Sequence, residues 1–77
     1  MYDNQVMVRF DDAYQLEEFV KAASDCDFEI DVKYRNSLID AKSILGMIAI
    51  GLKNNMLVCY GGSNSSFESV VNKYAIA

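Results

Sequence analysis

Residues 40–52, DAKSILGMIAIGL, decide how the rest of this chain is interpreted. The segment is almost entirely apolar from Ser43 onward, yet it carries the end signals of a helix. Ser43 can accept a hydrogen bond from an amide of the first turn, and Gly51 stands where a helix would end. In a chain of 77 residues the core is thin, so such a helix cannot be covered on every side. We predict a helix over residues 43–51 with one side exposed.

The order of residues around this helix indicates which side that is. At about 100° per residue, Met47 and Ile50 fall on one side with Gly46, whose small size permits close approach to a sheet. Leaving a large apolar side chain in water forgoes about 1.5–3 kcal/mol, and small soluble domains seldom expose such a patch without a partner. We therefore expect a protein-binding surface made of three side chains: Ile44, Leu45 and Ile48. In the alternative, a loop or the last helix covers the segment, or residues 48–52 are extended.

The segments next to this helix have the alternation of strands. Residues 28–34 alternate apolar and acidic or basic side chains, which predicts the clearest strand of the chain. Residues 35–37 are suited to a tight turn into a short strand over 38–40. After the helix, residues 53–55 favour a turn, 56–60 a strand, and 61–64 a loop.

The two outer parts of the chain each favour a helix, and a first strand precedes them. Residues 5–10 alternate, and Asp11 or Asp12 can then cap a helix, with Gln15 suited to a capping box on Asp12. Apolar residues recur at helical spacing as far as Ala23, so this helix ends near Ser24. Ser65 and Glu68 suggest another capping box, which begins the last amphipathic helix.

The predicted order of elements is β-α-β-β-α-β-α. Helices with one apolar stripe each must cover one face of an antiparallel sheet and leave the other face in contact with water. The fold class is therefore α+β: an open-faced β-sandwich in which three helices cover one face of a four-stranded antiparallel sheet, as one domain over residues 1–77. A ferredoxin-like arrangement satisfies the same order and is the alternative.

Composition excludes several classes of function. The net charge is −4 and the seven basic residues are scattered, which argues against nucleic acid as a partner. No run of about 18 apolar residues could span a membrane, and no signal peptide is visible, so the expected location is the cytoplasm. Cys26 and Cys59 are isolated, and the chain has no histidine, so we expect buried thiols, no metal site and no cofactor. Because no nucleophile and base occur together, an enzyme is not expected.

Two blocks of the sequence resemble the HPr family, the histidine-containing phosphocarriers of the bacterial sugar phosphotransferase system. They are 19-FVKAASDCDFEIDV-32 and 41-AKSILGMIAIGL-52, the second similar to the segment that carries the family's regulatory serine. The resemblance implies an open-faced β-sandwich of HPr type, and docking of protein partners through Ile44, Leu45 and Ile48. It also implies phosphorylation of Ser43 by a dedicated kinase, where the phosphate would meet the positive end of the helix.

The chain departs from the family at the phosphoryl-accepting segment. Counting back from Phe19, Asp12 occupies the position of the histidine, Tyr14 that of the arginine and Gln15 that of the proline. A relay needs a nucleophile that titrates near neutral pH and a cation that steadies the phosphoryl group, and both are missing. The chain thus resembles a degenerate member of the family that lacks the active-site histidine. Asp12 is expected to cap its helix; its alternative role is to accept phosphate as an acyl phosphate.

Three functions follow from these observations. The first is a non-catalytic regulatory or docking protein that acts through the helix of Ser43. Its partner would be a phosphotransferase-system enzyme, a serine kinase or a transcription regulator. The second is a phosphocarrier that uses Asp12. The third is a ferredoxin-like ligand-binding or dimerisation module, with Gly61 and Gly62 as a weak indication of a ligand loop.

Overall fold

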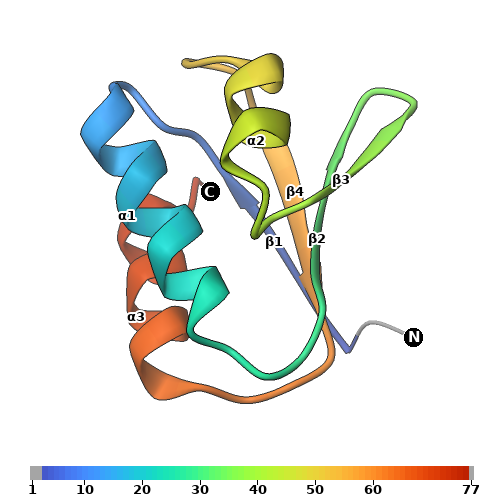
Figure 1. Ribbon diagram of the computed structural model, residues 1–77, viewed down its shortest axis with the longest axis vertical. Coiled ribbons are helices and arrows are strands. Elements are labelled where there is room, and N and C mark those ends of the chain that lie inside the picture. The colour runs from blue at the N-terminus through green and yellow to red at the C-terminus, as the bar shows by residue number, and fades with distance from the viewer. Residues whose placement is uncertain (1–2, 77) are drawn as a thin grey trace.

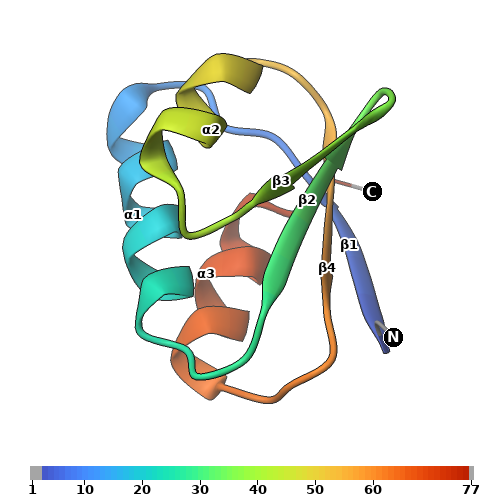
Figure 2. The ribbon, with the colours of Figure 1, turned by 45° about the vertical axis from the view of Figure 1, so that its right-hand side comes forward.

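The structure is a computed structural model that describes residues 3–76. Its elements are β1 (Asn4–Val8), α1 (Ala13–Ser24), β2 (Ile30–Tyr34), β3 (Ser37–Asp40), α2 (Ile44–Ile50), β4 (Met56–Tyr60) and α3 (Ser65–Tyr74). Figure 1 shows the order along the chain, and in Figure 2 the three helices lie together on one side of the sheet. The predicted element order and fold class are confirmed.

The sheet has the strand order β1-β4-β2-β3, and all neighbouring strands are antiparallel. Val6 lies opposite Val58, Val58 opposite Val32, and Val32 opposite Ile39, so one row of β-branched side chains crosses the whole sheet. Because β1 is at the edge, the sheet differs from the ferredoxin-like arrangement, which places its first strand inside. The alternative fold is therefore wrong.

The core lies between the sheet and the helices and is built on phenylalanine. Phe10, Phe19 and Phe67 are fully buried, and the ring of Phe19 lies 5.1 Å from that of Phe10 and 5.8 Å from that of Phe67, centroid to centroid. Tilted ring pairs at this spacing add to the free energy of burial. They join the segment after β1 to α1 and α3. Both cysteines are free and buried, as expected.

Two predicted boundaries are wrong for reasons of packing. The strand expected over residues 28–34 begins only at Ile30, because the ring of Phe28 leaves the sheet to lie near Gly62 and to stack at 6.2 Å on Tyr60. The strand expected over residues 5–10 ends at Val8, although Phe10 is still buried.

The cap of α3 is Asn64 and not Ser65, which is the first helical residue. The Asn64 side chain accepts a hydrogen bond from the Phe67 amide at 2.9 Å, and the Glu68 carboxylate accepts one from the Asn64 amide at 3.0 Å. Glu68 therefore takes part in a capping box as expected, but with Asn64 in place of Ser65.

The segment after α3 runs along the outer edge of β1. The amide of Ile76 donates to the carbonyl of Met7 at 2.9 Å, the amide of Arg9 donates to the carbonyl of Tyr74 at 3.3 Å, and Ala75 forms an antiparallel bridge with Val8. The unpaired polar groups of an edge strand are a template for pairing with another chain, and here this segment satisfies part of them.

Among residues 3–76, no helix has the length and apolar character that crossing a membrane requires.

Candidate functional site

Helix α2 is held by caps at both ends. The Ser43 hydroxyl accepts a hydrogen bond from the Gly46 amide at 3.2 Å, so Ser43 is the N-cap that the sequence predicts. At the other end Gly51 has φ +91°, a conformation that favours glycine, and its amide donates to the carbonyl of Met47 at 3.3 Å. The seven-residue helix is thereby fixed at its start and its end.

The side of α2 that faces the sheet is the predicted one. Met47 is completely buried and Ile50 is partly buried. Gly46 lies directly against β3, because a Cβ atom at this position would be 2.7 Å from Cγ2 of Ile39. Only glycine lets the two elements approach this closely without a shift of the isoleucine.

The opposite side of α2 is exposed. Leu45 is 77% exposed, Ile48 57% and Ile44 38%, and Leu52 just beyond the helix is 41% exposed. We call the surface formed by Ile44, Leu45 and Ile48 the α2 surface. Residues 48–50 are helical, so the extended alternative is wrong. Leu52 was missed from the sequence because it lies past the capping glycine, where helical spacing no longer applies.

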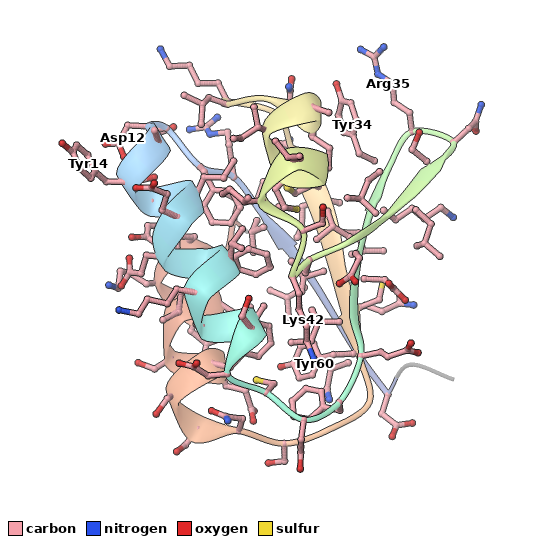
Figure 3. The ribbon with its side chains drawn as sticks, viewed as in Figure 1. Asp12, Tyr14, Tyr34, Arg35, Lys42 and Tyr60 are labelled. Carbon is pink, nitrogen blue, oxygen red and sulfur yellow. The ribbon has the colours of Figure 1, made fainter. Side chains whose placement is uncertain are left out.

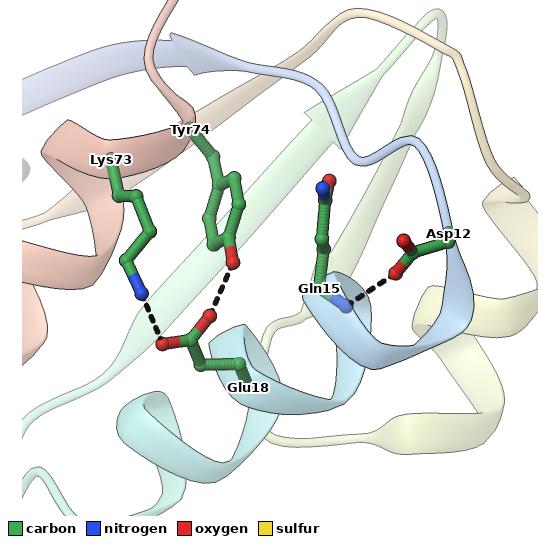
Figure 4. Close-up of polar contacts among 5 residues, drawn as sticks. All are labelled: Asp12, Gln15, Glu18, Lys73 and Tyr74. Carbon is green, nitrogen blue, oxygen red and sulfur yellow. Dashed lines mark hydrogen bonds and ion pairs between the residues drawn. The ribbon is translucent and has the colours of Figure 1, made fainter.

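Asp12 lies at the start of α1 and caps it. Its backbone is extended and its Oδ1 atom accepts a hydrogen bond from the Gln15 amide at 3.0 Å (Figure 4). The Gln15 side chain accepts one in return, but from the amide of Asp11, at 2.8 Å. In the predicted capping box Gln15 would bond to the amide of Asp12, and it bonds to the amide of Asp11 instead. The Asp12 residue is exposed.

The start of α1 and the end of α2 lie at the same end of the molecule, as Figures 1 and 2 both show. The connection is direct, since the amide of Lys53 donates to the carbonyl of Phe10 at 2.7 Å. Asp12 thus lies at the end of the molecule that carries the α2 surface, whereas the 83% exposed ring of Tyr14 projects from α1 away from α2 (Figure 3).

Two lysines tie the helices to one another. Lys42, just before the cap of α2, donates through Nζ to the carbonyl of Cys26 beyond α1, at 2.8 Å. Lys73 on α3 pairs with Glu18 on α1, Nζ to Oε2, at 2.6 Å. The cationic groups of both residues therefore serve the packing of the helices.

The Glu18 carboxylate also receives the hydroxyl of Tyr74 (Figure 4). The hydrogen bond from Lys73, followed by that from Tyr74, lowers the pKa of Glu18 below its ordinary value. The same carboxylate raises the pKa of Tyr74 to about 12, with burial as a smaller cause. No local pattern reveals this cluster, because Glu18 lies more than fifty residues before its partners.

Comparison with known proteins assigns the chain to a family. The family model described as the PTS HPr component phosphorylation site matches residues 13–59, which is more than half of the chain. The chain belongs to the HPr family. HPr proteins are phosphocarriers of the phosphotransferase system and interact with its enzymes. The match includes Ser43 and the α2 surface, and it begins one residue after Asp12.

The fold is that of a solved HPr structure. The crystal structure of HPr-C-His from Thermoanaerobacter tengcongensis superposes with a TM-score of 0.72 at 21% identity, and the match covers 91% of this chain and 92% of that one. No curated protein matches the chain. The resemblance that the sequence suggested is thus confirmed at the level of family and fold.

Proposed function

We propose that this HPr-like chain is a non-catalytic regulatory or docking protein that binds a protein partner through the α2 surface. The observation that carries the proposal is that Leu45 and Ile48 are 77% and 57% exposed on a helix whose other side is anchored by the fully buried Met47. Because α2 is capped at both ends, its apolar residues are held in place for contact with another molecule.

The proposal includes the loss of phosphate transfer on histidine, since the chain contains no histidine. At the family's acceptor position Asp12 serves as a helix cap, and Tyr14 has no charge to offer at the position of the arginine. The hollow beside the start of α1 is lined by two cations, Arg9 and Lys73. Both are already paired, Arg9 with Asp11 and Lys73 with Glu18, which disfavours Asp12 as a substitute carrier.

Regulation through Ser43 is a further part of the proposal. Its hydroxyl is partly buried and caps α2, so a phosphate there would lie against the free amides of the first turn. About two added negative charges beside the α2 surface would change which partners it attracts. Incubation with an HPr serine kinase should give a mass shift of one phosphate that is lost in Ser43→Ala.

Partner capture tests the docking role. Wild type and Ile48→Asp are immobilised and exposed to a bacterial lysate, with Leu38→Asp as the matched control. Leu38 lies on β3 and is 59% exposed, close to the 57% of Ile48, so the two changes differ in location and not in chemistry. We expect Ile48→Asp alone to lose a specifically retained protein. Equal retention by wild type and Ile48→Asp would contradict the docking role.

The carrier alternative has its own test. The protein is incubated with the phosphotransferase enzymes and labelled phosphoenolpyruvate, and we expect no stable label. A hydroxylamine-labile label that disappears in Asp12→Ala would replace the regulatory proposal with a carrier that forms an acyl phosphate.

A further inference from the structure

The charges around the α2 surface are unequal. Helix α2 itself carries none, so its electrostatic character is set by the residues at its border. On one side lies the start of α1, where Asp12 is exposed. This segment is held next to the end of α2 by the hydrogen bond from Lys53 to Phe10.

Glu17 adds a second carboxylate to the same border. Successive residues of a helix are about 100° apart, so Glu17 and Glu18 lie on different flanks of α1. Glu18 contacts α3 through Lys73 and Tyr74. Helix α1 packs against both α2 and α3. The flank of Glu17, which is exposed, is therefore the one next to α2.

The cations near this border are largely engaged elsewhere. Lys42 reaches away to the carbonyl of Cys26, and Arg9 pairs with Asp11 at 3.5 Å. Lys53 is exposed and remains beside the surface, whereas Lys21, one turn after Glu17 on α1, is exposed as well but lines the hollow between α1 and α3. Among residues 3–76, no salt bridge includes Asp12 or Glu17. The α2 surface is thus apolar at its centre and mainly acidic along the side formed by α1.

From this charge arrangement we infer that the partner is a protein with an apolar hollow bordered by lysine or arginine. The inference rests on the proposed docking function and adds the chemistry of the partner to it. A basic border would pair with Asp12 and Glu17. An acidic border would place like charges opposite one another and be repelled.

Two synthetic peptides test this inference. Both are amphipathic helices with the same leucine face; one has arginine and lysine along its flanks and the other has glutamate. Each is titrated into the isotopically labelled protein and followed by the amide signals. We expect the basic peptide to bind about tenfold more tightly at low salt, with a preference that shrinks as salt is added. The shifted amides should belong to residues 43–52 and 12–17.

A matched pair of variants locates the charges. Asp12→Asn with Glu17→Gln removes two carboxylates and keeps a capping side chain at the start of α1. Asp27→Asn with Glu29→Gln makes the same change at two exposed residues of the loop after α1. We expect the first variant to lose most of the preference for the basic peptide and the second to keep it.

The outcomes separate this inference from the docking function. Equal binding of both peptides, abolished by Ile48→Asp, would overturn the acidic border and leave the docking surface intact. Basic binding that does not depend on Ile48, or that shifts only residues 27–31 and 40, would overturn the inference and count against the docking surface as well. Failure of both peptides to bind would overturn the inference.

Discussion

Replacing Ile48 with aspartate should abolish partner binding while the protein stays folded. Ile48 is 57% exposed, so somewhat less than half of the burial free energy of an isoleucine contributes to folding. This share is about 0.6–1.3 kcal/mol, and a negative charge near the C-terminal end of the helix adds about 0.3–1 kcal/mol. The expected loss in the free energy of unfolding is therefore about 1–2 kcal/mol, or roughly 4–16 °C in melting temperature for a domain of this size.

The effect on binding should be larger. The exposed part of Ile48 would contribute about 0.9–1.7 kcal/mol if a partner buried it completely, and that contribution is lost. An unpaired carboxylate in the interface costs more still, so the affinity should fall by at least about tenfold. The captured partner or the basic peptide serves as the ligand, and calorimetry measures the dissociation constant.

Met47→Ala is the contrasting variant, one position earlier in the same helix. Met47 has no exposed surface, so its truncation should cost about 2–5 kcal/mol in urea unfolding. The reasoning fails if Ile48→Asp destabilises the fold as much as Met47→Ala, because the two sides of α2 would then be assigned wrongly. It also fails if the folded Ile48→Asp variant binds as wild type does.

Four further predictions concern the fold. Asp12→Ala should lower the free energy of unfolding in urea by about 1 kcal/mol and Asp12→Asn by only a few tenths, and equal losses would exclude capping as the cause. Gly62→Ala should cost about 1–3 kcal/mol, because a Cβ atom would lie 2.2 Å from the ring of Phe28; an unchanged urea midpoint would contradict this contact. With its pKa raised to about 12, Tyr74 should stabilise the fold fully below pH 10 and lose this contribution as the pH rises from about 10 to 12. When tyrosine ionisation is followed by ultraviolet absorbance, the step at the highest pH should be missing in Tyr74→Phe. If that step is unchanged in the variant, the hydrogen bond from Tyr74 to Glu18 is contradicted. The pKa of Glu18 is lowered, so the ionised carboxylate should stabilise the fold above its ordinary pKa of 4.5. This stabilisation should be lost as the pH falls through the lowered pKa.

Features set by neighbouring residues could be predicted from the sequence. The strand Met56–Tyr60, the N-cap Ser43 and the burial of Met47 all follow from local spacing, and the structure has each of them. The exposed side of α2 follows in the same way, because helical spacing decides which residues share a side. The family resemblance then placed this helix in a complete fold.

Features that depend on distant residues could not be predicted. Phe28 leaves the alternating pattern because its ring fits over Gly62, a contact between segments more than thirty residues apart. The cluster of Glu18, Lys73 and Tyr74 joins two helices from opposite ends of the sequence. The acidic border beside the α2 surface likewise arises only when α1 and α2 are packed together.

The pairing of Ala75 and Ile76 along β1 affects the chain during its synthesis. β1 is translated before the other six elements, yet the residues that shield its outer side are translated after all of them. While the elements between them are translated, the nascent chain therefore holds a strand whose backbone hydrogen-bonding groups are unpaired, the condition in which neighbouring nascent chains can associate. Slow translation of α3 would prolong this vulnerable interval, and rapid completion would shorten it.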